Sequence, residues 1–168
     1  NNDYKVLPLK KVIRNLQSKE SLPSNCVSLT ADDGFLSIYT EAFPLLAKYQ
    51  FPMSVFVSTN PIDKKYDSMV TWSQLREMAP LVDIYNHSVN HLHLVNKDAQ
   101  IVEDEIFFAQ ERIMSEMNTN DKFFAYPYGE FDDLTYSYLK SKGYIAFGQH
   151  SGVASQTSDF LNIPRFSM

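Results

Sequence analysis

The sequence lacks the features that mark disulfide scaffolds, membrane proteins and nucleic-acid-binding proteins. Its 168 residues include a single cysteine, Cys26, so no internal disulfide can form. No apolar run approaches the roughly 20 residues that a membrane-spanning helix needs, so we expect no transmembrane segment. No basic block stands out and the net charge is −5, which argues against nucleic acid as a partner. No signal peptide is recognisable, and the start at Asn1 leads us to expect a mature or trimmed chain.

What the sequence does contain is typical of one globular domain. Hydrophobic residues make up 44% of the chain and charged residues 21%, a balance that favours a packed core. The length suffices for one full core and is short for two. We therefore expect a single domain over residues 1–168. Its core should cover about 25–168, after a polar lead-in that holds a short helix near 12–16.

Apolar periodicity predicts strands and helices in alternation. The clearest helix covers 98–117, where apolar residues fall on one helical stripe. Thr71 and Gln74 have the spacing of a capping box, which should open a helix that ends near Pro80. This alternation predicts an α/β fold with a mostly parallel sheet, open or closed into a barrel. The predicted strands cover 26–30, 53–57, 81–85, 123–126 and 144–147, and the remaining helices cover 37–49 and 132–142.

Two adjacent carboxylates, Asp32 and Asp33, directly follow the first predicted strand. Like charges at this separation repel unless a cation lies beside them. In isolation the pair would be interpreted as a helix cap, because Asp is a favoured N-cap residue. A metal ion would also resolve the repulsion, provided that the chain offers further ligands.

Polar groups follow three other predicted strands in the same way. Asn86 and His87 come after one strand, the segment 126–129 after another, and Gln149 and His150 after the last. The C-terminal ends of parallel strands share one face of the sheet, and that face builds the site in α/β folds. We therefore expect these groups and the two aspartates to gather in one cleft.

His87 and His91 lie four residues apart, a spacing that points both rings the same way on a helix or tight turn. With Asp33 they form a set of two histidines and one carboxylate, which is typical of catalytic zinc sites with an open position. Asp32, which the metal does not need, is then free to act as a general base toward water. His93 could substitute as a ligand, although its direction differs from that of His91.

Three segments together resemble the first three motifs of the polysaccharide deacetylase family, which is the NodB homology domain of carbohydrate esterase family 4. The resemblance runs from about residue 27 to the end of the chain, in the order that the family shows. The Tyr-Pro-Tyr-Gly sequence of the third segment is similar to that of members acting on poly-N-acetylglucosamine. The segments are 30–34 (TADDG), 87–91 (HSVNH) and 124–129 (FAYPYG).

The resemblance implies a distorted (β/α) barrel with fewer than eight strands. It implies hydrolysis of N-acetyl groups on an N-acetylglucosamine-containing polysaccharide or oligosaccharide, and therefore an extracytoplasmic location in the periplasm, the cell envelope or the medium. By the same resemblance Asp33, His87 and His91 hold a divalent metal, usually zinc. Asp32 is the base, and the backbone N–H of Tyr128 helps to stabilise the oxyanion.

Two groups that the family usually carries are missing from their usual positions. Many members have an arginine two residues before the proline of the third motif, where this chain has Ala125, and the usual Leu-x-His near the C-terminus is absent. Arg165 could replace the guanidinium if the chain end folds back to the cleft, and a surface ion pair is the alternative. His150 is the remaining candidate for the general acid, although a lone loop histidine is more often solvated.

Two other functions stay open at this point. The first is a related amide hydrolase acting on a non-sugar C–N bond, because the metal site alone does not select the acyl acceptor. The second is a carbohydrate-binding module that keeps the metal without turnover, which the missing arginine and histidine would favour. Retention of Asp32 argues against the second, because a binding site has no need of a base.

Overall fold

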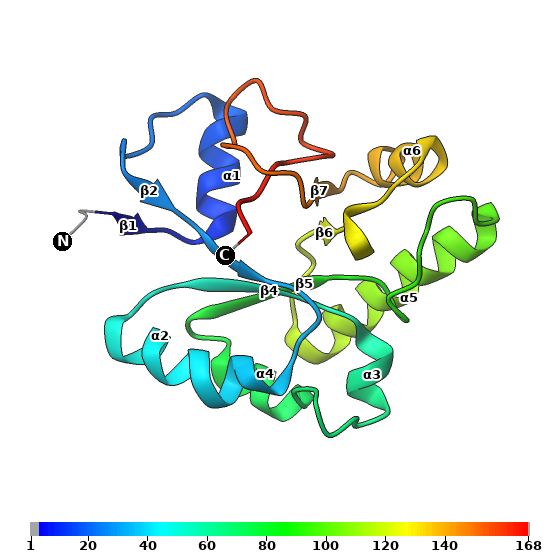
Figure 1. The fold of residues 1–168 in the computed structure, drawn as a ribbon, viewed down its shortest axis with the longest axis horizontal. Helices are drawn as coiled ribbons and strands as arrows, with labels where there is room; N and C mark the ends of the chain where they lie inside the picture. The colour runs from blue at the N-terminus through cyan, green and yellow to red at the C-terminus, as the bar shows by residue number, and fades with distance from the viewer. Residues whose placement is uncertain (1–3, 168) are drawn as a thin grey trace.

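A curled parallel sheet with helices packed on both of its faces forms the framework of the computed structural model (Figure 1). The structure describes residues 4–167. Five strands follow one another in the order β3-β4-β5-β6-β7, all parallel, and β1 and β2 form a separate parallel pair. The fold confirms the predicted α/β class and the barrel of fewer than eight strands, which here closes only part of the way.

The elements have the following bounds. The strands are β1 (Lys5–Val6), β2 (Cys26–Val27), β3 (Leu29–Ala31), β4 (Met53–Val57), β5 (Val82–Asn86), β6 (Phe123–Ala125) and β7 (Ile145–Phe147). The helices are α1 (Leu9–Ser18), α2 (Phe43–Tyr49), α3 (Thr59–Asp63), α4 (Trp72–Met78), α5 (Ala99–Met117) and α6 (Asp133–Ser141), with the short turns η1 (Ile38–Ala42) and η2 (Pro127–Gly129).

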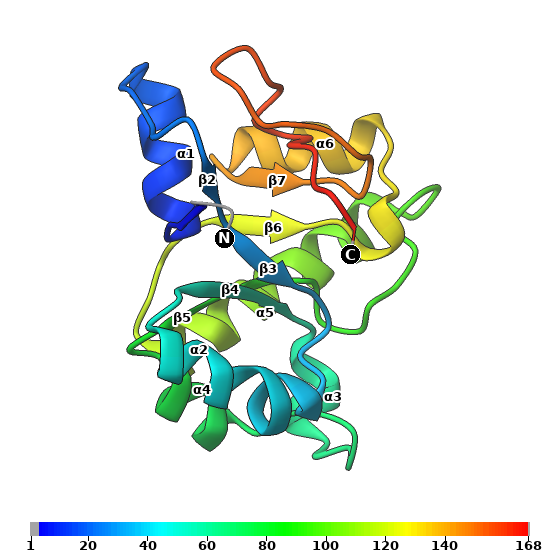
Figure 2. The same ribbon diagram turned by 60° about the vertical axis from the view of Figure 1, so that its left-hand side comes forward.

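Both faces of the sheet are covered, so its strands are mostly apolar, as parallel strands usually are, although Ser54, Asp83 and Asn86 interrupt the pattern. In β4, Val55 and Val57 belong to the core that faces α2 and α4, whereas Phe56 belongs to the core on the other face. There it packs with Leu9 and Ile13 of α1. Figure 2 shows α1 on the opposite side of β4 from α2 and α4, whereas Leu139 of α6 packs with Ile106 of α5 against Phe124 and Ala146 on the outer face.

The N-terminal segment takes a larger part in the fold than its polar composition indicates. The helix expected over 12–16 is longer, Leu9–Ser18, and its apolar side chains Leu9 and Ile13 are buried. β1 also pairs with β2, so the strand expected over 26–30 is divided between two partners. The packed core therefore extends to Leu9 instead of beginning near residue 25.

The helix expected over 37–49 contains a widened turn, η1, before α2 begins. Pro44 has no N–H to donate, and its ring would clash with the carbonyl of Thr40 in a regular helix. The chain accommodates the proline by a π-turn, in which the N–H of Phe43 donates to the carbonyl of Ile38. Pro44 therefore accounts for the interruption.

The predicted capping box is confirmed at the start of α4. The Thr71 hydroxyl accepts from the N–H of Gln74, and the Gln74 side chain accepts from the N–H of Thr71. These two bonds satisfy backbone donors that the first turn of a helix leaves free.

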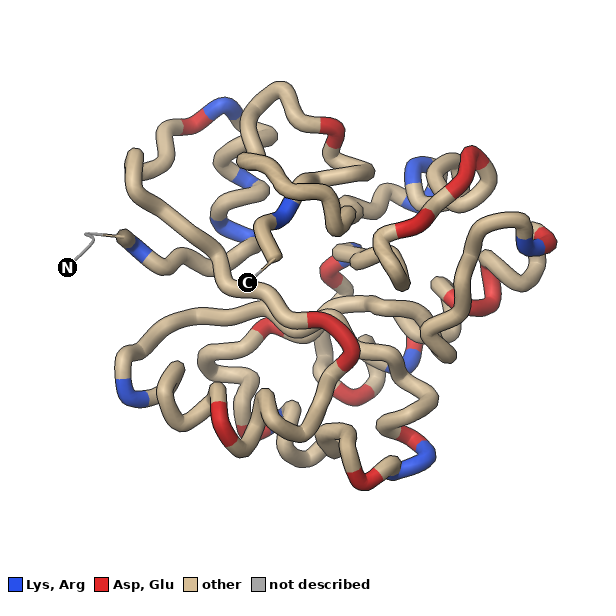
Figure 3. The backbone as a smooth tube through the Cα atoms, in the orientation of Figure 1, with Lys and Arg blue, Asp and Glu red and all other residues tan. Residues whose placement is uncertain are grey.

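Charged residues of both signs are interspersed along the chain, without a continuous basic block over residues 4–167 (Figure 3). Over the same residues, every helix is either too short or too polar to cross a membrane.

Candidate metal centre

The predicted site residues lie on loops that follow the C-terminal ends of neighbouring strands. Asp32 and Asp33 follow β3, His87 follows β5, and Tyr128 lies in η2 after β6. The parallel register places these ends side by side, with Val57 of β4 paired to Asn86 of β5. The gathering that the sequence predicts is therefore present for these residues.

The turn at Asp33 and Gly34 aims the second carboxylate into the site. Both residues are in the left-handed region, with φ of 71° and 87°. A Cβ on Gly34 would lie 3.1 Å from Cγ1 of Val57 in the neighbouring strand. Glycine is thus required here both by the backbone conformation and by the close approach of β4.

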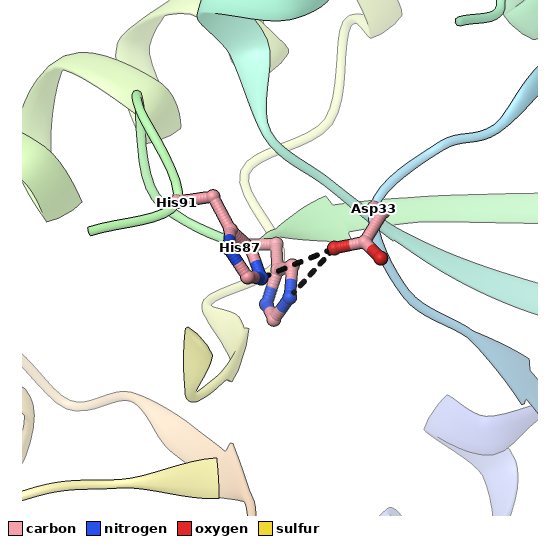
Figure 4. Close-up of side chains that lie close together, drawn as sticks. All are labelled: Asp33, His87 and His91. Carbon is pink, nitrogen blue, oxygen red and sulfur yellow. Dashed lines mark ion pairs between the residues drawn. The ribbon is translucent and has the colours of Figure 1, made fainter. Parts of the chain in front are cut away.

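Asp33, His87 and His91 converge on one point, as Figure 4 shows. Nε2 of His87 lies 3.4 Å and Nε2 of His91 3.2 Å from Oδ1 of Asp33. One potential ligand atom from each residue lies within 4.8 Å of the others. Three ligand atoms facing one another across such a gap fit a divalent cation bound by two imidazoles and a carboxylate.

The environment of His87 fixes which ring nitrogen faces the site. The side chain is 1% exposed and its Nδ1 lies 2.8 Å from the carbonyl oxygen of Ala125. A carbonyl can only accept, so Nδ1 carries the hydrogen and donates it. Nε2 is left to face Asp33, and two such electron-rich atoms come together favourably only with a proton or metal cation between them. A carbonyl behind the ring is the usual support of a ligating histidine.

The pKa shifts of Asp33 and His91 also favour the protonation states that bind a metal cation. The close contact with the His87 imidazole holds the pKa of Asp33 below its usual value, although partial burial acts in the opposite direction. Burial, followed by the neighbouring His87, lowers the pKa of His91. An ionised carboxylate and a neutral imidazole are the forms that bind metal.

The loop between the two histidines brings their rings together without a helix. Ser88 and His91 have φ of 69° and 56°, and the N–H of His91 donates to the Ser88 hydroxyl. The two imidazole rings lie 4.8 Å apart between centroids. The spacing of four residues thus brings the two rings together through a tight loop with left-handed residues, and not through a helix.

Asp32 points to a different partner, Arg165. The guanidinium donates from Nη1 and Nη2 to the two carboxylate oxygens of Asp32, both at 2.7 Å. Both side chains are largely buried, at 19% exposure for Asp32 and 15% for Arg165. Nε of Arg165 donates to the carbonyl of Gly148. The chain end therefore folds back to the cleft, and Arg165 is not a surface ion pair.

Tyr128 lies beside the histidines in a strained conformation. Its φ is 60° and its ψ is 6°, values that non-glycine residues adopt mainly at turns and functional sites. Its ring stacks on His93 at 3.7 Å and meets the edge of His91 at 4.5 Å. Nδ1 of His93 lies 2.8 Å from Oε2 of Glu130, and among residues 4–167 this histidine is not part of the converging ligand set.

His150 lies on the loop after β7 and its side chain is exposed. Its backbone carbonyl accepts from the N–H of Arg165. Within residues 4–167 its imidazole makes no hydrogen bond to the other candidate residues, so its predicted role stays a prediction. A cavity of about 450 Å³ adjoins Asp32 and Arg165, and Gln149 and Phe166 contribute to its wall.

We compared the sequence and the structure with those of known proteins. A family model described as polysaccharide deacetylase matches residues 19–147. The poly-β-1,6-N-acetyl-D-glucosamine N-deacetylase of Escherichia coli K12 is 27% identical over 98% of this chain, and that of Staphylococcus epidermidis is 27% identical over 98%. The solved structure of the Streptococcus pyogenes deacetylase PplD in complex with acetate is 26% identical. It superposes with a TM-score of 0.92 over 97% of this chain and 73% of its own.

The chain spans only part of the curated relatives that it matches. It covers 31% of the Escherichia coli protein and 61% of the Staphylococcus epidermidis protein. The match therefore concerns the domain described above.

Proposed function

This chain belongs to the polysaccharide deacetylase family, and we propose that it is a metal-dependent hydrolase that removes N-acetyl groups from an N-acetylglucosamine polymer or oligomer. The observation that carries the proposal is the separation of the two aspartates. Asp33 faces two histidines and Asp32 faces Arg165. A metal ligand and a base are thus available side by side.

We assign Asp33, His87 and His91 to a divalent metal, which we propose to be zinc. The convergence of three ligand atoms and the Nδ1 hydrogen bond of His87 support this assignment. When bound, such an ion would polarise the amide carbonyl and make water more acidic.

The remaining residues supply proton transfer and orientation. An oxygen of Asp32 accepts a proton from water as the water oxygen bonds to the acetyl carbon. Arg165 holds that carboxylate in one orientation through its paired hydrogen bonds. The backbone N–H of Tyr128 donates to the carbonyl oxygen as negative charge develops there.

The C–N bond then breaks, and the sugar nitrogen takes a proton as it leaves as an amine. We assign this proton to the imidazole of His150, which lies on the loop that Arg165 holds to the site. The acetyl group leaves as acetic acid, which passes its proton to the free amine, so one amide and one water give one acetate and one ammonium. Asp32 returns its proton, and His150 regains one, through solvent.

The position of Arg165 weakens the alternative of a binding module without turnover, since the missing guanidinium was a reason to consider it. Two relatives are named for deacetylation of poly-β-1,6-N-acetyl-D-glucosamine, which favours a sugar substrate over another amide. Because polymers of this kind lie outside the cytoplasm, we propose an extracytoplasmic location.

Acetate release tests the proposal directly. The substrates are β-1,6- and β-1,4-linked N-acetylglucosamine oligomers, partly acetylated polymer and peptidoglycan, each with zinc added and then chelated. We expect Asp32→Asn to bind zinc and lose activity, whereas His87→Ala loses both. Asp133→Asn, the same chemical change at an exposed helix terminus, is the matched control.

Two results would contradict the proposal. Stoichiometric zinc binding with no acetate from any sugar substrate would exclude deacetylation. Normal turnover by Asp32→Asn would show that the base is another residue.

A further inference from the structure

Glu105 is a buried carboxylate outside the candidate catalytic set. It lies on α5 and is 5% exposed. Glutamate is rarely buried to this degree without a partner that compensates the lost hydration. In the described part of the chain, both of its carboxylate oxygens accept hydrogen bonds from one residue, Asn90.

Asn90 is part of the loop that carries the two ligand histidines. Its backbone N–H donates to Oε2 of Glu105 at 2.8 Å, and its Nδ2 donates to Oε1. Its Oδ1 accepts from Nδ2 of Asn60 at 2.6 Å. The N–H of Val89 also donates to the backbone carbonyl of Glu105. The loop is thus tied to α5 through the residue directly before His91.

This loop requires external support because its backbone is strained. Ser88 and His91 both adopt the left-handed conformation that disfavours L side chains. Such conformations persist only where the surrounding structure fixes them. Glu105 supplies that restraint from a helix, which is a more rigid element than a loop.

We propose that Glu105 is a positioning residue of the metal centre, which sets the direction of His91 by holding Asn90. The inference rests on the metal site of the proposed function. Partners one step outside the ligands typically change metal affinity by about 10- to 100-fold when they are removed. We expect Glu105→Ala to weaken zinc binding within that range.

The hydrogen-bond directions allow a sharper test by exchanging donor and acceptor. Glu105→Gln places an amide donor against the amide donor of Asn90, and Asn90→Asp places a carboxylate against that of Glu105. The double variant restores a match, because the amide introduced on α5 donates to the carboxylate introduced on the loop, while the oxygen of that amide still accepts the backbone N–H. The new loop carboxylate can still accept from Asn60, and the net charge equals that of the wild type.

Zinc affinity of each folded variant is measured by competition with a chromophoric chelator, and amide hydrogen exchange of residues 87–91 is followed in the zinc-free protein. Gln110→Ala is the matched control, because Gln110 lies on the same helix, is also 5% exposed and bonds to the carbonyl of Asp121. We expect both single variants to bind zinc at least about tenfold more weakly and to exchange faster at Val89 and Asn90. The double variant should recover, and Gln110→Ala should keep the wild-type affinity even if it unfolds at a lower temperature.

Equal zinc affinity in wild type and Glu105→Ala would overturn the inference and leave the metal site intact. The inference would also be overturned if Gln110→Ala lost zinc affinity to the same extent, or if the double variant bound zinc as weakly as the weaker-binding single variant. Either result would mean that Glu105 contributes to folding in general and not to the direction of His91. If those variants fail to fold, Glu105→Asp is tested in their place. It moves the carboxylate back by one methylene, and we expect the same loss of zinc affinity. A wild-type protein that binds no zinc would overturn the metal site, and this inference with it.

Discussion

Removing the guanidinium of Arg165 should reduce turnover while leaving the metal centre in place. Arg165 forms two hydrogen bonds of 2.7 Å with the carboxylate of Asp32 and none with the residues assigned to the metal. Because both partners are largely buried, solvent screens this pair less than an exposed one. The perturbation therefore acts on the orientation of one carboxylate.

The size of the effect follows from the geometry. A hydrogen bond to a charged group contributes about 1.5–3 kcal/mol. If misorientation of Asp32 raises the activation free energy by the contribution of one of these two bonds, kcat falls by about 10- to 150-fold. Arg165→Lys should fall short of full activity as well, because an ammonium cannot form the paired contact.

The assay measures steady-state acetate release together with zinc affinity. We expect Arg165→Ala to lower kcat within that range, to retain zinc, and to recover part of its activity when millimolar guanidinium is added. Arg76→Ala is the control, since Arg76 forms an exposed ion pair with Glu116. A wild-type kcat in Arg165→Ala would refute the reasoning, and so would a loss that appears only as weaker zinc binding.

Three further predictions concern single side chains. Tyr128→Phe should keep kcat within about twofold, because the proposed donor is the backbone N–H; a loss of tenfold in acetate release would implicate the phenol instead. His150→Gln should lower kcat by about 10²-fold or more, as expected for a general acid, and His93→Gln should not, so the reverse result would move the acid to His93. Asp132→Ala should lower the free energy of unfolding by about 1 kcal/mol at pH 7 in a urea titration, because Asp132 caps α6 by accepting from the N–H of Thr135. That bond holds the pKa of Asp132 below the unfolded value of about 3.9, so the difference from wild type should be present above pH 4 and disappear as the pH falls through the folded pKa. A difference that persists at pH 2 would contradict this assignment.

The parts of the fold that local sequence rules govern could be predicted. The capping box at Thr71 and the long stripe of α5 are local signals, and both elements appear where they are expected. The role of α1 could not be predicted, because it depends on Phe56 and Phe147 across the sheet, far away in sequence. The division of the first strand at Ser28 has the same origin, since each half pairs with a different neighbour.

The candidate site likewise contains residues that could be predicted from the sequence and one that could not. Asp33, His87 and His91 could be found because strand ends of a parallel sheet share one face, a rule that needs no tertiary detail. Glu105 was missed, although a signal was present: it lies three residues after Val102 and four before Ala109, on the buried stripe of α5. A charged residue on such a stripe must have partners, but the sequence does not tell which loop supplies them.

The adjacency of Asp32 and Asp33, which looks unfavourable in the sequence, becomes reasonable once each carboxylate has its own positive partner. The left-handed turn at Asp33 directs its carboxylate toward His87 and His91, while Asp32 meets the guanidinium from the far end of the chain. With the proposed metal ion on one side and Arg165 on the other, two charges of like sign can stay ionised side by side, because each positive partner offsets their repulsion. The same arrangement prevents the two residues from exchanging roles, since the paired hydrogen bonds of Arg165 keep Asp32 away from the histidines. Exchanging Arg165 for a neutral residue should therefore affect Asp32 first, and the metal ligands only as far as Asp32 moves toward them.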